Sequence, residues 1–264
     1  MAYKMIVLDL DGTLTNSKKE ITPRTYEALM EAQKKGVVVV LASGRPTYGI
    51  MPLAKQLKLA EYGGYILAYN GGKIMDCKSG DTVFNQELCP DLVPMLYDEA
   101  MAAGVQILTY QGDGIAATKA DDDYVEHEAF INKMPVVEYS DFKNQVEYPI
   151  NKCLIVGDPE PLHKLALKLE GKISVYRSAP FFLECVPLGI EKSQSIDKLI
   201  KTIGIKQEEV IAVGDGYNDM GMIQYAGLGV AMANAEEEVK AAANYVTLSN
   251  EEDGVAVVVE KFIK

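Results

Sequence analysis

Two carboxylates follow a short apolar stretch near the start of the chain. Residues 5–8, MIVL, combine apolar and β-branched side chains, which is typical of a buried strand in a parallel sheet. Asp9 ends this stretch, and Asp11 lies two residues further on. Carboxylates at the end of a buried strand are costly unless a partner compensates their charge. Hard divalent cations bind carboxylate oxygens, so the pair predicts a metal site, with a solvated turn as the alternative.

A second acidic cluster follows another apolar stretch, residues 210–213, VIAV. Asp215 occupies the same place after this stretch that Asp9 occupies after the first, and Asn218 and Asp219 open a helix. Helix capping explains Asn218 or Asp219, but it does not explain an acid directly after the strand. If Asp9 and Asp215 meet at one edge of a sheet, they can hold Mg²⁺ through its usual one or two carboxylates.

Ser43, Gly44 and Lys192 are candidates for binding an anion. Ser43 and Gly44 follow the apolar residues 37–42 and open a helix, so they combine a hydroxyl with backbone N–H groups at a strand end. Lys192 begins a later helix, where lysine opposes the helix dipole and usually faces solvent. A lysine aimed at a phosphate is the exception, because it offers a point charge to the oxyanion. Each signal is weak alone and gains weight beside the acids.

The elements that carry these residues alternate between strands and helices. Thr22 and Pro23 mark a helix start, and Gly36 marks its end. Further strands are predicted over 37–43, 65–70, 210–215 and 228–234, and a hairpin over 73–76 and 82–85. Further helices are predicted over 46–59, 192–204, 218–227, 236–244 and 254–264. Strand, helix and strand with short links imply a parallel sheet. The expected fold class is therefore α/β, with a Rossmann-like doubly wound core.

The middle of the chain has a different character. Residues 86–184 hold 17 acidic and 8 basic side chains, so they carry most of the chain's net charge of −12. Helices are predicted over 89–104, 124–134 and 159–171, and strands that partly alternate over 105–111, 114–119, 152–158, 172–178 and 181–187. These features indicate an inserted α+β domain. The expected division is core 1–84, insert 85–186 and core 187–264.

Composition excludes several classes of partner. The chain is acidic and has no basic cluster, which argues against nucleic acid and against anionic membranes. No signal-peptide core and no bilayer-length apolar run is present, so a cytoplasmic location is expected. The four cysteines are Cys77, Cys89, Cys153 and Cys185; they form no C-x-x-C and are expected to be buried small hydrophobes in a reducing compartment.

Four motifs stand in order along the chain: D-L-D-G-T at 9–13, S-G-R at 43–45, Lys192, and G-D-G-Y-N-D at 214–219. In this order they resemble the haloacid dehalogenase superfamily. L-A-S-G-R-P, Y-N-G-G and G-D-G-Y-N-D-M are most similar to its Cof-type sugar-phosphatase branch. Positions 44–191, 148 residues, separate Ser43 from Lys192, far more than two βα units need. The insert thus resembles the cap that the family calls C2, subtype C2B.

The resemblance implies a Mg²⁺-dependent phosphatase that acts on small phosphorylated metabolites, sugar phosphates above all. It implies Asp9 as nucleophile and Asp11 as general acid and base, with Asp11 protonated before the first step. It also implies phosphate binding by Leu10, Ser43, Gly44, Lys192 and Asn218, and metal binding by Asp9, Asp11 (through its carbonyl) and Asp215. Asp219 is implied either as a metal ligand or as a partner that orients Lys192.

Three alternatives stay open from the sequence. The first is a signalling module that is phosphorylated on Asp9 without turning over small molecules, although receiver domains lack the long insert and an acid in the role of Asp11. The second is a sensor that binds phosphate esters without hydrolysing them. The third is a phosphomutase, although mutases of the superfamily resemble members with smaller caps.

Overall fold

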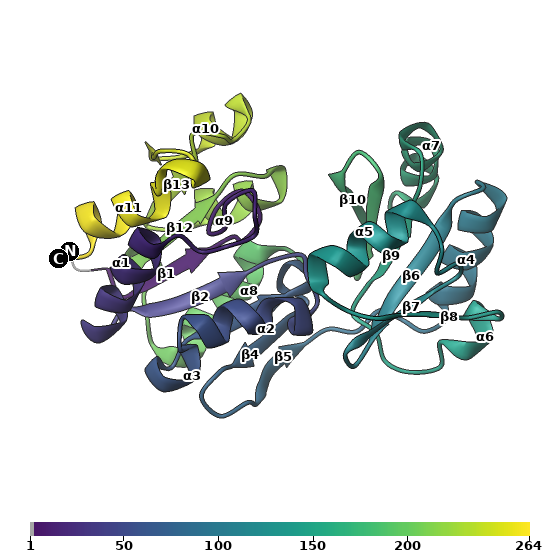
Figure 1. Ribbon diagram of the computed structural model, residues 1–264, viewed down its shortest axis with the longest axis horizontal. Coiled ribbons are helices and arrows are strands. Elements are labelled where there is room, and N and C mark those ends of the chain that lie inside the picture. The colour runs from purple at the N-terminus through teal and green to yellow at the C-terminus, as the bar shows by residue number, and fades with distance from the viewer. Residues whose placement is uncertain (1–2) are drawn as a thin grey trace. The chain divides into compact units, whose positions relative to one another are not determined.

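The computed structural model describes residues 3–264, and the chain divides into two compact units. The first unit joins Met1–Phe84 to Glu191–Lys264, and the second comprises Asn85–Ile190. Both units appear in Figure 1, where the second runs from blue to green by residue number. Each is described below by itself.

The first unit is built on one eight-stranded sheet with the order β14-β13-β12-β1-β2-β3-β4-β5 within the described residues. The strands from β14 to β3 are parallel, and β4 is antiparallel to β3. Their bounds are β1 Met5–Leu8, β2 Val38–Ala42, β3 Tyr65–Ala68, β4 Lys73–Asp76, β5 Thr82–Asn85, β12 Val210–Gly214, β13 Leu228–Ala231 and β14 Tyr245–Val246. This arrangement confirms the α/β class with a parallel core.

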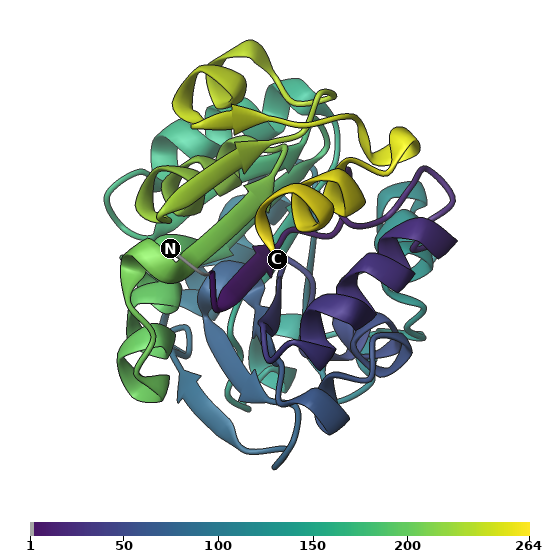
Figure 2. The same ribbon diagram turned by 90° about the vertical axis from the view of Figure 1, so that its left-hand side faces the viewer.

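Helices cover both faces of this sheet. They are α1 Pro23–Lys34, α2 Thr47–Gln56, α3 Leu59–Tyr62, α8 Lys192–Ile203, α9 Met220–Tyr225, α10 Glu237–Ala242 and α11 Gly254–Phe262. Ile6 and Leu8 of β1 pack in one apolar cluster with side chains of α1, α2 and α11, whereas Met5 and Val7 pack in another with α8 and α9. Figure 2 shows α1 (purple) and α11 (yellow) on one side of the strands and α8 (green) on the other. Burial on both faces explains why these strands are continuous apolar runs.

The second unit contains a six-stranded sheet with the order β10-β11-β9-β6-β7-β8. Its strands are β6 Gln106–Gln111, β7 Gly114–Ala117, β8 Val136–Glu138, β9 Cys153–Val156, β10 Ser174–Ala179 and β11 Phe182–Val186. Its helices are α4 Leu92–Ala102, α5 Asp123–Asn132, α6 Phe142–Gln145 and α7 Pro159–Leu169. Side chains of α4, α6 and α7 pack with Ile107 and Ile155 of the sheet. Glu128 of α5 bonds the Tyr110 hydroxyl on the opposite face.

A few elements differ from the prediction. β8, β14 and α6 were not predicted; they have three, two and four residues and are too short for a periodic signal. The helix predicted over 46–59 ends at Gln56, and Lys58, in the left-handed region at φ 55°, separates it from α3. Cys153 and Cys185 are buried as expected, but Cys89 is exposed and Cys77 half-buried; all four are free thiols. Within residues 3–264, no helix is both long and apolar enough to cross a bilayer.

Candidate active site

Three neighbouring parallel strands end at one edge of the core sheet, and each is followed by a predicted site residue. Leu8 of β1 lies opposite Leu41 of β2 and Val213 of β12. The backbone N–H of Asp9 donates to the Val213 carbonyl at 3.0 Å, so the backbone pairing of β1 with β12 continues one residue beyond Leu8. Asp9, Ser43 and Asp215 therefore emerge side by side, as expected for the ligand-binding edge of a parallel sheet.

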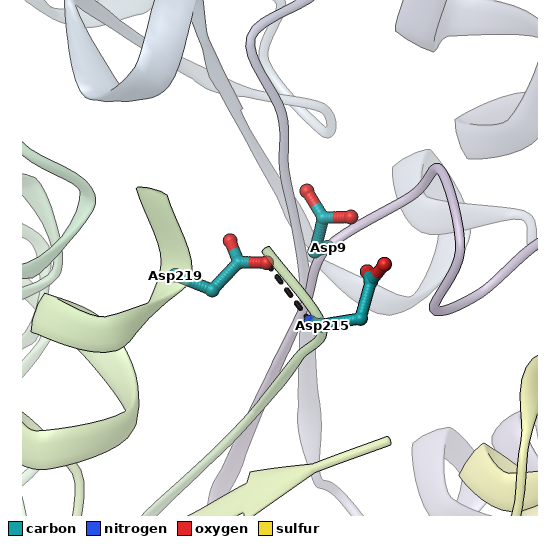
Figure 3. A group of neighbouring side chains, drawn as sticks. All are labelled: Asp9, Asp215 and Asp219. Carbon is teal, nitrogen blue, oxygen red and sulfur yellow. Dashed lines mark hydrogen bonds between the residues drawn. The ribbon is translucent and has the colours of Figure 1, made fainter. Parts of the chain in front are cut away.

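Lys192, the first residue of α8, lies between two of the acids. Its Nζ donates to Asp9 Oδ1 and to Asp219 Oδ1, each at 2.6 Å, and its side chain is 1% exposed. The other oxygen of Asp219, Oδ2, accepts the backbone N–H groups of Asp215 and Gly216 at 3.0 and 2.9 Å. Figure 3 shows the three carboxylates, with the bond from Asp215 N to Asp219 dashed. Asp219 thus ties Lys192 to the loop that carries Asp215.

Burial and mutual repulsion shift the pKa values of the acidic side chains. Burial, the repulsion of Asp219 and, to a smaller extent, that of Asp215 raise the pKa of Asp9 well above its ordinary value, and Lys192 only partly opposes this. Burial raises the pKa of Asp215 to about 6, against the hydrogen bond from Thr13. Burial alone would lower the pKa of Lys192, but Asp219 and Asp9 outweigh it and raise that pKa. One lysine therefore faces three carboxylates, and the excess negative charge favours a cation.

The donor set fits a hard divalent cation. Asp9, Asp215 and Asp219 each offer one carboxylate oxygen, and these oxygens lie within 4.8 Å of one another. However, both Asp219 oxygens already accept hydrogen bonds, from Lys192 and from two backbone N–H groups. Asp9 and Asp215 are consequently the better direct ligands. Carboxylates alone suit Mg²⁺, which takes one or two of them together with waters and other oxygens.

The loop after β1 is folded closely around Asp215. Thr13 Oγ1 donates to Asp215 Oδ1 at 2.6 Å, across 202 residues of sequence. Gly12 has φ 87°, and a Cβ at this position would collide with the Asp215 carboxylate. The Leu10 carbonyl accepts the N–H and the hydroxyl of Thr15, each at 2.9 Å, which closes the turn. Glycine at position 12 is therefore required both by the turn and by the nearness of Asp215.

Asp11 points to a different set of partners. Arg45 donates from Nε to Asp11 Oδ2 at 2.8 Å and from Nη2 to Oδ1 at 2.6 Å, a bidentate arrangement. Lys19 Nζ adds a third bond to Oδ1 at 2.6 Å. Burial alone would raise the pKa of Asp11, but Arg45 and Lys19 outweigh it and lower the pKa. The family resemblance implied a protonated Asp11, whereas these partners favour the carboxylate.

The phosphate-site candidates Ser43, Gly44 and Asn218 come together around Asn70, which follows β3. The Ser43 hydroxyl accepts the backbone N–H of Arg45 at 3.2 Å, and the Ser43 carbonyl accepts that of Asn70 at 2.9 Å. The Asn218 amide donates to Asn70 Oδ1 at 3.0 Å. Residues that the sequence assigned to separate motifs thus share one hydrogen-bonded frame.

Four residues of this site were missed from the sequence: Thr13, Lys19, Arg45 and Asn70. Arg45 belongs to the S-G-R motif, and an arginine beside an acid-rich site was the one signal that could have assigned it a carboxylate partner. Lys19 reaches Asp11 from a turn in which it adopts φ 62°, a conformation that its residue type does not indicate. Thr13 lies in the D-L-D-G-T motif and Asn70 in Y-N-G-G, where Asn before Gly indicates a turn, but neither pattern predicts the partners of these side chains.

A doubly wound parallel sheet with acids and a buried lysine at its carboxyl edge is compatible with an α/β phosphohydrolase. The family model described as haloacid dehalogenase-like hydrolase matches residues 6–259, and the chain belongs to this family. It is similar to the crystal structure of a haloacid dehalogenase-like hydrolase from Bacteroides thetaiotaomicron, at 52% identity and a TM-score of 0.93, over 98% of this chain and 99% of that chain.

Two further relatives carry phosphatase names. One is the 5-amino-6-(5-phospho-D-ribitylamino)uracil phosphatase YcsE of Bacillus subtilis, 30% identical over 98% of this chain and 96% of that protein. The other is the subclass IIB sugar phosphatase BT4131, whose structure matches 98% of each chain at 26% identity with a TM-score of 0.85. The family and these relatives identify the protein as a phosphatase with a Cof-type organisation.

Proposed function

We propose that the protein is a Mg²⁺-dependent phosphatase of small phosphomonoesters and that it forms an aspartyl phosphate on Asp9. The observation that carries this proposal is the buried Asp9 carboxylate, held at one oxygen by Lys192 and accompanied by Asp215 at a cation-binding distance. A carboxylate whose charge is offset by a lysine and a cation can approach an anionic phosphate and act as nucleophile.

In the first step an Asp9 oxygen bonds to phosphorus while the bond from phosphorus to the leaving oxygen breaks. Asp11 gives a proton to that oxygen. In the second step Asp11 takes a proton from the water that attacks phosphorus, while the bond from phosphorus to the Asp9 oxygen breaks and releases the carboxylate and inorganic phosphate. Its partners Arg45 and Lys19 favour the ionised form, so Asp11 stands ready as the base. For the first step it must loosen these bonds, take up a proton and reach the leaving oxygen.

Three kinds of donor hold the phosphoryl oxygens in this proposal. Lys192 provides the charge, the backbone N–H groups of Leu10 and Gly44 provide fixed dipoles, and Ser43 and Asn218 provide side-chain hydrogen bonds. Asp9, Asp215 and the Asp11 carbonyl would hold Mg²⁺, which would offset the repulsion between the carboxylates and the phosphate. Asp219 keeps Lys192 in place, and it is the weaker candidate for a metal ligand than Asp9 and Asp215, because its two oxygens already accept three hydrogen bonds.

The names of the relatives support the proposed substrate class. BT4131 is called a sugar phosphatase, and YcsE is named for a phosphate ester on a ribityl chain. Both names describe small polyhydroxylated phosphomonoesters, and the acidic net charge of −12 disfavours nucleic acid. We therefore propose a sugar phosphate or a similar polyol phosphate as the substrate.

A substrate panel tests the proposal. Purified protein is assayed for phosphate release from sugar phosphates, polyol phosphates and p-nitrophenyl phosphate, with Mg²⁺ and with excess chelator. We expect Mg²⁺-dependent release and the highest kcat/KM for a polyol ester. If phosphate esters bind but no phosphate is released from any of them, the protein is a binding module. If turnover persists unchanged in chelator, the metal assignment is wrong.

A further inference from the structure

The turn after β3 adopts an unusual backbone conformation. Tyr69, Asn70 and Gly71 all have positive φ, at 54°, 55° and 97°. Left-handed backbone is readily available to glycine but disfavoured for tyrosine and, to a smaller extent, asparagine, so two such residues in succession store strain. Strain of this kind persists only where the surroundings hold the backbone, and it gathers at functional sites.

Three hydrogen bonds to the loop after β2 and to α8 hold this turn. The N–H groups of Tyr69 and Asn70 donate to the carbonyls of Arg45 and Ser43 at 3.0 and 2.9 Å. From the other side, the Ser195 hydroxyl of α8 donates to the Gly71 carbonyl at 2.6 Å, and a Cβ on Gly71 would collide with that hydroxyl. The turn is therefore fixed between the loop after β2 and the helix that Lys192 begins.

The backbone of Asn70 fixes the Ser43–Gly44 peptide. No peptide bond in the described chain is cis, and in a planar trans peptide the C=O and the following N–H point in opposite directions. Since the Ser43 carbonyl points to Asn70 N, the Gly44 N–H points away from the turn. Glycine is needed at position 44, because a Cβ there would lie 2.9 Å from Asn70 Nδ2.

The side chain of Asn70 fixes a second group. Its Oδ1 accepts the Asn218 amide at 3.0 Å, and Asn70 is only 3% exposed although Asn218 itself is exposed. An exposed amide has several rotamers, and a buried acceptor selects the one that brings its Nδ2 against Asn70. Asn70 thus sets the direction of one backbone donor and one side-chain donor from opposite ends of the chain.

We propose that Asn70 is a positioning residue for the phosphoryl group. The Asn70 N–H orients the Gly44 N–H through the Ser43 carbonyl, and the Asn70 side chain orients the Asn218 amide. The strained turn keeps these two donors in place relative to each other. The inference rests on the proposed phosphate site, and it adds a residue that touches no substrate atom. Asn70 acts through Gly44 and Asn218.

The test separates the side chain from the backbone. Asn70→Gly keeps the backbone N–H and relaxes the left-handed conformation, but it removes the acceptor for Asn218. We expect the urea midpoint to stay at or above that of the wild type, while the inhibition constant of inorganic phosphate and the KM for p-nitrophenyl phosphate rise about threefold to tenfold. Lys58→Gly is the matched control. Lys58 is an exposed residue of the first unit at φ 55°, and its replacement should leave the inhibition constant of phosphate and the KM unchanged.

A double-mutant cycle with Asn218→Ala decides how Asn70 acts. If Asn70 works through the Asn218 amide, the variant carrying both changes should bind phosphate as weakly as Asn218→Ala alone, with no additional loss. Fully additive effects, or wild-type phosphate inhibition in Asn70→Gly, would overturn the positioning role while wild-type turnover still supported the proposed function. Absence of any phosphate inhibition and turnover in the wild type would overturn the proposed function itself.

Discussion

Lys192 donates a 2.6 Å hydrogen bond to Asp9, although 183 residues separate the two in the chain. The same ammonium group bonds Asp219 at the same distance, and all three side chains are nearly inaccessible to solvent. Buried charges are tolerated only while their partners remain in place. Breaking this contact should therefore weaken the junction between the two parts of the core, and in the proposed mechanism the same contact holds Asp9 in place for its attack.

Replacing Lys192 should cost both stability and activity. Lys192→Met leaves two buried carboxylates without their cation, and breaking a buried ion pair in this way destabilises by about 3–5 kcal/mol. Lys201→Met is the control on the same helix, since Lys201 pairs with Asp197 at the surface and should change stability by no more than about 0.5 kcal/mol. Urea unfolding of the metal-free proteins measures the free energy of unfolding of the two variants. Equal losses in the two variants would contradict the account.

Asp215 and Asp219 should differ in their effect on the metal. Asp215→Asn removes a proposed ligand, so the Mg²⁺ concentration for half-maximal activity should rise steeply or activation should vanish. Asp219→Asn disturbs Lys192 and the Asp215 loop, and it should lower kcat by about 10–100-fold with a smaller change in the Mg²⁺ requirement. Mg²⁺ titrations of turnover rank the two variants. The reverse order would make Asp219 the direct ligand.

Stabilisation by Mg²⁺ should grow with pH. Burial raises the pKa of Asp215 to about 6 from an ordinary 3.8, so folding favours its protonated form. In the metal-free protein, the stability that this protonation contributes is complete below the unfolded pKa of Asp215 and is lost as the pH rises through about 6. Mg²⁺ needs the carboxylate, so protons compete with it at low pH. Thermal melting should show a larger Mg²⁺-induced rise in Tm at about pH 8 than at about pH 5. This difference should shrink in Asp215→Asn.

Arg45 should set the acidic limb of the pH–rate profile. It helps to lower the pKa of Asp11 against burial, so Arg45→Met should raise that pKa and move the acidic limb of kcat to higher pH, by about one unit or more. Lys18→Met, a change at an exposed lysine next to Lys19, should leave the limb in place. If both variants keep the wild-type profile, Asp11 does not control that limb.

The sequence predicted those parts of the site that lie directly after strands. β1, β2 and β12 are continuous apolar runs, so the residues that follow them, Asp9, Ser43 and Asp215, could be placed at one edge of a sheet. The side-chain partners within the site were not predictable in the same way. For example, Arg45 meets Asp11 across 34 residues through side-chain geometry that depends on the folded loop.

Backbone conformation accounts for the other omissions. Lys19 and Asn70 reach their partners from left-handed positions. Lysine does not indicate this conformation. Asparagine before glycine favours it, but the Y-N-G-G wording was interpreted only as a family likeness. β8 and β14 pair with neighbours over three and two residues, so their existence depends on the sheet rather than on their own sequence. Tertiary context therefore decided every feature that the sequence analysis missed.

Phosphoenzyme formation in the Asp11→Asn variant is the most direct test of the proposed chemistry. p-Nitrophenolate needs little protonation to leave, so this variant should still transfer the phosphoryl group to Asp9 but lack the base that activates water. Acid quenching during turnover of labelled p-nitrophenyl phosphate, followed by peptide mapping, should find phosphate accumulating on Asp9, with none in Asp9→Asn. Release of phosphate by the wild type with no protein-bound phosphate in Asp11→Asn, or labelling that survives in Asp9→Asn, would contradict an aspartyl phosphate on Asp9.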